Sequence, residues 1–315
     1  MSKYRVIGGM ALACALSAAA GCKRPSTAAD AHAQNADDTM VKTLDKGERP
    51  RSELRYYIPA GTTTSSTTTF RAATLATSTE ETALSVMPGL RLDIVSGPAE
   101  LTDHGVKLKV DVVRSEAIVP TGFDEDMAQK LRATAAVAEQ IGGWIEIDDR
   151  GRTLAVELND QAKRADLPIR LLRMIVNTRE TLTRVRLPEE KVGLGARWEA
   201  RQVITAYGFK IDEVSTYTLV DRAGDELMLN VTVEQTAPPQ VIEFPDESIV
   251  VSVESLTGHA QGQIILNLNA LESDASASGK VEDHLIVKTS EGTDRVQVIE
   301  EFQVEIANTS ALIGG

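Results

Sequence analysis

The sequence predicts an α+β protein that is mostly antiparallel β, with a curved sheet or half-barrel carrying two helices on one face. Three observations support this class. Apolar and polar residues alternate along several stretches of the 315-residue chain, which is the period of strands with one buried face. Glycine-containing turn motifs lie between these stretches. Two segments in the middle of the chain have helical spacing instead.

Alternation is clearest in three predicted strands, each with Val, Leu or Ile on one face and charged or amide residues on the other. Turn motifs that contain glycine separate strands of this kind along the chain. The strands cover residues 106–112, 227–233 and 264–268, and the turns cover residues 149–151, 222–225 and 291–294.

Two segments fit the alternation less well. In the last strand, residues 296–306, Glu300 falls on the inward series with Phe302 and Val304. A β-bulge near residues 299–301 is therefore expected to turn that carboxylate outward. Residues 62–69, TTTSSTTT, have high β propensity but no apolar face, so we expect an edge strand or a loop there.

Helical spacing places apolar residues on one face of residues 124–141, between an acidic start and Gly142-Gly143. Asp166 can cap a second helix, with Pro168 in its first turn, and Pro188 lies beyond its end. The alanines of the first helix favour close packing on a sheet.

The N-terminus has the three parts of an export signal. Two basic residues precede the apolar run of residues 6–20, which is too short and too rich in alanine to span a bilayer. Ala19-Ala20-Gly21 then precedes Cys22 and resembles the bacterial lipobox, with alanine where leucine is commonest. We therefore expect cleavage before Cys22 and acylation of its thiol. An ordinary secretory signal and modification at Cys14 are the alternatives.

Charge and cysteine content restrict the mature protein further. Cys14 leaves with the signal and Cys22 becomes the anchor, so no disulfide or cysteine metal site is expected. The net charge is −13, and removing Lys3 and Arg5 with the signal makes it −15. Such a balance argues against nucleic acid as a partner. Lys23, where an aspartate would signal inner-membrane retention, favours the outer membrane.

Three parts are expected along the chain: a lipoprotein signal peptide at residues 1–21, a disordered tether at 22–51 and a β-rich globular region at 52–308. The tether is polar and has no sustained periodicity. Deleting residues 23–46 is therefore expected to leave the melting temperature unchanged. The globular region is predicted to be one domain, with a possible subdivision near residue 188.

A proline turn, a valine, a glycine and a tryptophan follow one another in LPEEKVGLGARW, which begins at Leu187 and ends at Trp198. With LRYYIPAG around Tyr56 and GWIEIDDRG around Trp144, this element resembles an uncharacterised family of β-rich bacterial lipoproteins. The resemblance spans residues 54–236. It implies a β-rich architecture and carries no activity. We expect Trp198 to pack in the core, as the anchor of the loop that enters the following strand.

The sequence contains one partial match to a metal-binding motif. The opening of an EF-hand loop is matched by DASASGKVEDHL from Asp274, but Leu285 stands where a bidentate glutamate is required. A hairpin turn explains the same residues. Of the histidines, His104 and His259 stand beside glycines in turn-like contexts, and no pair has ligand spacing.

The chain has no convincing nucleophile elbow and no phosphate-binding loop. Acidic neighbours at residues 148–149 and 300–301 cannot converge, since adjacent strand residues point to opposite faces. Neither a catalytic residue nor a cofactor or metal site is therefore expected.

Together these observations predict a non-catalytic lipoprotein of the cell envelope, anchored in the membrane by acyl chains such as palmitate on Cys22. Its body is expected to bind a hydrophobic molecule or another envelope protein. A structural or assembly lipoprotein without a small ligand is the alternative, and a hydrolase without a recognisable motif is the third. A deep aliphatic pocket would favour the first, a flat exposed apolar patch the second and converging His and acids the third.

Overall fold

The computed structural model describes residues 40–78, 82–139, 141–160, 182–206, 209–244, 249–270, 273–290 and 292–309. Within them the chain forms a 14-stranded antiparallel sheet and one α-helix. The elements are β1 (Met40–Asp45), β2 (Thr64–Thr77), β3 (Thr82–Ser96), β4 (Glu100–Leu101), β5 (Val106–Ile118), α2 (Glu125–Ala138), β6 (Gly142–Ile147), β7 (Thr153–Leu158), β8 (Arg197–Ala206), β9 (Phe209–Ala223), β10 (Glu226–Ala237), β11 (Gln240–Phe244), β12 (Ile249–Asn267), β13 (Ser273–Lys288) and β14 (Thr293–Asn308).

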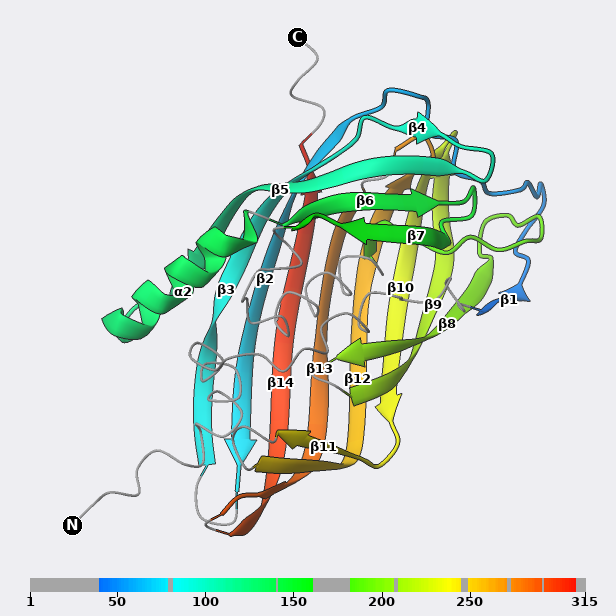
Figure 1. Ribbon diagram of the computed structural model, residues 1–315. Helices are drawn as coiled ribbons and strands as arrows, with labels where there is room; N and C mark the ends of the chain where they lie inside the picture. Colours follow the sequence, from blue (N-terminus) through cyan, green and yellow to red (C-terminus); the bar gives the residue numbers. More distant parts are fainter. Residues whose placement is uncertain are drawn as a thin grey trace.

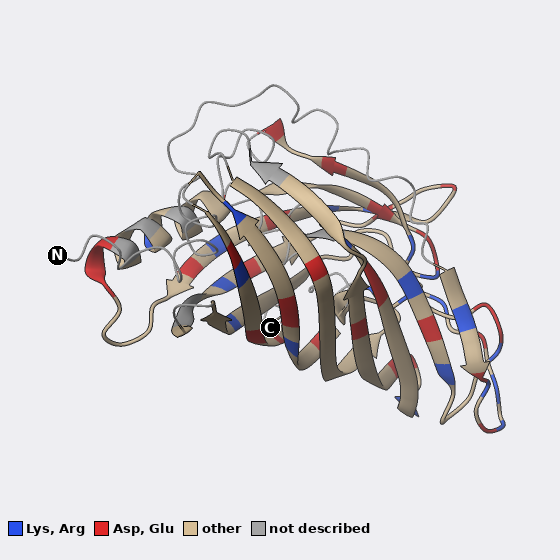
Figure 2. Cartoon of the chain, turned by 90° about the horizontal axis from the view of Figure 1, so that it is seen from below, with Lys and Arg blue, Asp and Glu red and all other residues tan. Residues whose placement is uncertain are grey.

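The strands follow the order β1-β8-β9-β10-β12-β13-β14-β2-β3-β5-β6-β7, with β11 added to β12 and β4 to β5. Figure 1 shows the long strands side by side, with β5, β6 and β7 crossing over one end. From below, the sheet is an arch (Figure 2). The prediction of a mostly antiparallel, curved sheet is therefore confirmed.

Alternation sorts the side chains of the central strands onto two faces, as the sequence predicts. Leu227, Leu229 and Val231 of β10 are buried, and so are Ile264 and Leu266 of β12. These residues belong to a cluster on the concave side of the arch, which we call the inner face. In β5 the alternation is weaker, since only Leu108 of that series is fully buried.

The first predicted helix is confirmed as α2, which lies beside β5 at one flank of the sheet (Figure 1). Ala128, Ala135 and Ala138 are buried, and the Ser115 hydroxyl of β5 donates to the Ala135 carbonyl at 2.6 Å. Alanines permit this close approach because they add little width to the helix. Most of the second predicted helix falls at residues 161–181, outside the described residues.

The threonine-rich segment is an interior strand, so the expectation of an edge strand or loop is wrong. It opens β2, which pairs with β14 on one side and β3 on the other. Thr64, Ser66 and Thr68 are buried on the inner face. Hydroxyl side chains are small and β-branched threonine suits a strand, so these positions are buried without an apolar pattern.

No bulge turns Glu300 outward, which corrects a second expectation. The pairing of β14 with β13 and with β2 runs through Glu300 without a register shift. Its side chain therefore stays on the inner face with Phe302 and Val304. The sequence rule that buried strand positions are apolar fails at this residue.

Order begins earlier than the tether predicted for residues 22–51. Residues 40–45 form β1, which pairs with β8 from Met40 with Arg201 to Asp45 with Arg197. The next residues lie against the segment after Leu187: the Glu48 amide donates to the Leu194 carbonyl at 2.8 Å. A Cβ on Gly193 would lie 1.9 Å from the Glu48 carbonyl oxygen, so only glycine fits there. Residues 22–39 and the signal lie outside the described residues.

Trp198 closes this end of the core, as the sequence predicts. Its side chain is 0% exposed. The indole Nε1 donates to the Arg186 carbonyl at 2.7 Å, and the ring stacks on Tyr217 with centroids 5.7 Å apart. Gly195, at φ 76°, provides the turn that leads the chain into β8. The LPEEKVGLGARW element is therefore a structural one that joins the early loop to the sheet.

Candidate functional site: the inner face

Five polar side chains lie in one cross-strand row on the inner face, between two apolar clusters, and Gly258 and Val281 stand between the third and the fourth of them. The row is continuous because each member is the register partner of the next across seven neighbouring strands. We call it the polar row; its members are Gln202, Glu213, Gln235, Gly258, Val281, Glu300 and Thr74.

Glu213 has two amide partners in this row. Gln202 Nε2 donates to its Oε1 at 2.8 Å, and Gln235 Nε2 donates to its Oε2 at 2.7 Å. Glu213 is 5% exposed, so these bonds supply part of what the buried carboxylate loses in leaving water. The two hydrogen bonds join side chains of β8, β9 and β10 across the inner face.

Asp283 and Glu300 lie one strand apart on the same face. Glu300 is the register partner of Val281, and Asp283 is the partner of Val298 and Leu256. Burial raises the pKa of Asp283 to about 6, while the charge of His284 opposes this rise. Burial, and then the charge of Asp283, raise the pKa of Glu300 to about 7. Asp283 Oδ1 is fully buried and accepts no hydrogen bond.

The row beside the polar row contains three small residues and Phe302, and we call it the small-residue row. Ala260 pairs with Gly279, Gly279 with Phe302, and Phe302 with Ala72. A Cβ on Gly279 would lie 2.7 Å from Phe302 Cζ, which shows that the phenyl ring lies over this glycine. Between the two rows is a cavity of about 40 Å3, lined by Glu213, Gln235, Gly258, Ala260, Val281 and Phe302 among others.

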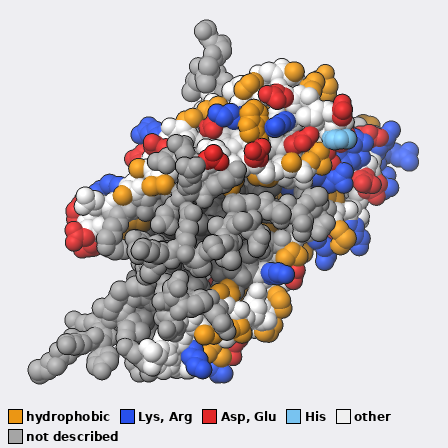
Figure 3. Space-filling model, in the orientation of Figure 1, with side chains coloured by type: hydrophobic (Ala, Val, Ile, Leu, Met, Phe, Trp, Pro, Cys, Tyr) orange, Lys and Arg blue, Asp and Glu red, His pale blue; other side chains and the backbone are white. Residues whose placement is uncertain are grey.

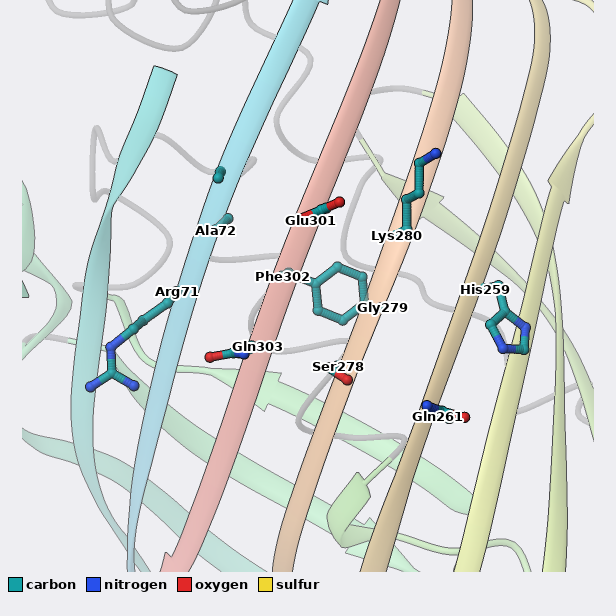
Figure 4. A pocket seen from close by; sticks show the side chains of 11 residues that line it. Arg71, Ala72, His259, Gln261, Ser278, Gly279, Lys280, Glu301, Phe302 and Gln303 are labelled. Atoms are coloured by element: carbon teal, nitrogen blue, oxygen red, sulfur yellow. The ribbon is translucent and has the colours of Figure 1, made fainter. Parts of the chain in front are cut away.

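The outer face of the same strands carries a shallow polar depression of about 540 Å3. Figure 4 shows Glu301, Lys280 and His259 on neighbouring strands around it, and the Phe302 ring reaching from β14 toward Gly279. His259 Nδ1 lies 2.6 Å from Glu234 Oε1. Lys280 Nζ lies 3.5 Å from Glu282 Oε2. Glu301, Lys280 and His259 are exposed, which suits a solvated face.

The residues singled out in the sequence do not converge. Residues 274–285 lie within β13, not in a hairpin turn, so alternate members of the calcium-loop match point to opposite faces. His259 lies in mid-strand and His104 in a loop. In the part of the chain that the structure describes, no three His, Cys, Asp or Glu residues are grouped to hold a metal ion.

The acidic neighbours also divide between faces. Glu300 is largely buried on the inner face, whereas Glu301 is exposed on the outer one. Asp148 accepts hydrogen bonds from the Arg150 and Arg152 amides and holds the β6–β7 turn, with Arg152 Nε 2.6 Å from its Oδ2. Asp149 pairs with Arg55 at 2.8 Å. Both aspartates therefore have structural roles.

Sequence reasoning missed the polar row. Its members are spread over seven strands, so no local motif connects them, although Glu300 stood out as a charge at an inward position. The other signal was Gln235, which continues the inward series of β10 after Val233. The sequence shows which polar residues fall at inward positions of each strand. It does not show which of them lie next to one another, because that depends on the register between strands.

Apolar side chains on the visible face are scattered among charged ones over the described strands (Figure 3). The large exposed apolar residues, such as Leu84, Leu101, Val156 and Val203, come from separate elements. No single element of the described chain therefore presents a broad apolar surface.

No family profile matches this chain, and no curated protein matches it. Among solved structures, the crystal structure of Pseudomonas aeruginosa OccK8 (OprE) aligns with 80% of this chain and 100% of that chain, at 5% identity and a TM-score of 0.18. Such a score does not relate the two folds. Across the described ranges, no helix has both the length and the apolar character to cross a bilayer.

Proposed function

We propose that this protein is a non-catalytic lipoprotein of the cell envelope, anchored through Cys22, whose inner face binds an amphiphilic molecule. One observation supports the binding proposal above all: the concave face is apolar at both ends and has the polar row across its middle. A ligand with an apolar chain and one polar group would match this arrangement of apolar and polar surfaces. Outer-membrane attachment belongs to the same proposal.

The ligand is expected to lie along the arch. The cavity of about 40 Å3 is far smaller than the several hundred Å3 of a pocket that encloses a drug-sized ligand. It marks the junction of the polar and small-residue rows and does not hold an acyl chain. The predicted second helix, with Leu172, Ile175 and Val176 on one face, is proposed to cover the same side of the sheet as α2.

The first experiment is mass spectrometry of the lipoprotein purified from its native membrane in mild detergent. A single class of amphiphile at near-stoichiometric amount is the expected result. Recovery of bulk lipids in membrane proportions would contradict binding and would favour a structural or assembly lipoprotein.

The second experiment locates the binding site with two variants, in each of which a different residue is replaced by glutamine. Val281→Gln places an amide at the cavity on the inner face, whereas Lys280→Gln changes the next residue on the outer face. Loss of one buried aliphatic contact is worth about 1.5 kcal/mol, or roughly a tenfold weaker affinity. We expect that loss for Val281→Gln alone, measured by fluorescence of a dansyl-labelled alkyl probe. Equal effects of the two variants would place binding elsewhere.

A further inference from the structure

We propose that the amphiphile of the inner face carries a primary ammonium head, which Asp283 and Glu300 bind from neighbouring strands. This inference rests on the proposed function and specifies the chemistry of its ligand. It concerns one occupant, a long-chain alkylammonium compound, and it follows from the position, the charge and the hydrogen-bonding state of these two carboxyl groups.

Position comes first. Asp283 of β13 and Glu300 of β14 are diagonal neighbours, because Asp283 pairs with Val298 and Glu300 with Val281. Diagonal neighbours on one face lie roughly 7–8 Å apart at Cα, a separation that long side chains bridge. A small cationic group placed between the two carboxyls can therefore reach oxygens of both.

On the strands around the pair the charge is one-sided, and the buried Arg186 lies instead beside Tyr56 and Tyr217 in the other apolar cluster. At the described inward positions of β2, β10, β12, β13 and β14 there is no lysine and no arginine. The other carboxylates of this face are Glu213, which its two glutamines bind, and Asp294 near the start of β14. His284 belongs to the opposite, outer face of β13. An anionic head would meet like charges here, whereas an ammonium group would meet complementary ones.

Hydrogen bonding supplies the independent observation. Asp283 Oδ1 is a fully buried atom that no donor reaches. Buried polar atoms without partners are uncommon and costly, so such an atom indicates a place for a donor. A primary ammonium group has three donors and no acceptor, which suits two carboxyls that have vacant acceptor positions. A divalent cation is a poorer fit, since Ca2+ takes six to eight oxygen ligands and the pair offers two carboxyls.

Apolar and aromatic side chains flank the carboxyl pair on the inner face. Val281 separates Glu300 from the polar side chains of β9 and β10 in the polar row. Phe302 follows Glu300 on the inner face, and its ring stacks on Phe70 with centroids 6.3 Å apart. An alkyl chain leaving the carboxyl pair would pass over Val281 and this aromatic pair.

Two probes of equal chain length test the head group. They are undecylamine and undecanoic acid, each with a dansyl group at the end of the chain opposite the head group. Each is titrated into the full mature chain, in which Cys22→Ser removes the lipid anchor and keeps the protein soluble. The amine is expected to bind at least tenfold more tightly than the acid at pH 8. Equal or tighter binding of the acid would overturn the inference while leaving the proposed function intact, and no saturable binding of either probe would overturn both.

Glu300→Gln and Glu301→Gln form a matched pair, because the two glutamates are adjacent on β14 and point to opposite faces. A charge-assisted hydrogen bond contributes about 1.5–3 kcal/mol, so Glu300→Gln should weaken amine binding by about tenfold or more. Glu301→Gln should change it by less than about twofold. Asp283→Asn is the second inner-face variant, and since each substitution removes a buried charge, neither is expected to unfold the protein. Amine binding that is insensitive to both inner variants would refute the assignment.

Two further measurements separate a head-group site from adventitious attraction. Amine affinity should rise from pH 5 to pH 8 as the carboxyl pair loses its protons, whereas a flat profile would contradict the role of the pair. Butylamine, which has the head without the chain, should displace the probe only at far higher concentration. Displacement at equal concentration would show a site for free amines and would refute the amphiphile.

Discussion

Trp198 offers the sharpest test of how the core is packed. The indole is 0% exposed, it stacks on Tyr217, and its Nε1 donates to the Arg186 carbonyl. Replacing it with alanine removes all three features. The residue also lies where the early loop, the segment after Leu187 and β8 meet, so few neighbours can move into the space.

The magnitude follows from these contacts. Truncating a buried tryptophan to alanine costs about 3–5 kcal/mol, and loss of the donor to a buried carbonyl adds about 1 kcal/mol or more. We therefore expect the free energy of unfolding to fall by about 4–6 kcal/mol, a large part of the roughly 5–15 kcal/mol that holds a typical domain together. Trp198→Phe keeps most of the ring and loses the hydrogen bond, so its cost should be about 1–3 kcal/mol.

The assay is urea denaturation followed by circular dichroism, because Trp144 would be the one remaining tryptophan in a fluorescence signal. The two substitutions separate ring volume from hydrogen bonding. A loss below about 1 kcal/mol for Trp198→Ala would place the indole at the surface and would refute the packing.

Three other predictions concern the anchor, the first strand and the buried acids. Cys22→Ala should abolish labelling with a radioactive fatty acid and release the protein from membranes; retention in the detergent phase would contradict the anchor. Deleting residues 23–39 should leave the melting temperature unchanged, whereas deleting residues 23–46 should lower it, because the longer deletion removes β1; equal melting temperatures would mean that β1 contributes nothing. The raised pKa values of Asp283, about 6, and Glu300, about 7, mean that the folded state keeps protons that the unfolded state loses above pH ~4. The free energy of unfolding should therefore decrease as pH rises from about 4 to about 7 and then level off, and Glu300→Gln should flatten that decrease; a constant difference between variant and parent over this range would exclude the titration.

The sequence predicted a curved, mostly antiparallel sheet because apolar and polar residues alternate in the sequences of β10, β12 and the start of β5, and it predicted α2 from its helical spacing. Those patterns are local, and local spacing is enough to identify an amphipathic element. It predicted the burial of Trp198 for a similar reason, since a proline turn, two glycines and a tryptophan define a compact loop.

What the sequence missed depends on partners distant along the chain. β1 is polar and looks like a tether, and it becomes a strand because β8 offers a free edge more than 150 residues later. β2 has no apolar alternation at its start, yet it is interior because β14 and β3 enclose it. Glu300 is the clearest case. The alternation of its own strand predicted a β-bulge that would turn the side chain outward, whereas the structure keeps it on the inner face. Only the register of seven strands reveals the row to which it belongs.

The place of β14 in the sheet also determines the order in which this protein can fold. Strands β2 to β7 form one flank and β8 to β13 most of the other, and the twelve residue pairs between β14 and β2 join them. During synthesis the β2–β7 flank therefore emerges first, and the edge of β2 that pairs with β14 stays open until residues 293–308 arrive. Pairing between such distant segments is slow, and an open strand edge is prone to aggregation. We expect the nascent chain to need a chaperone until its last strand is released. A truncation before β14 should leave two separate sheets with exposed, aggregation-prone edges in place of one folded domain.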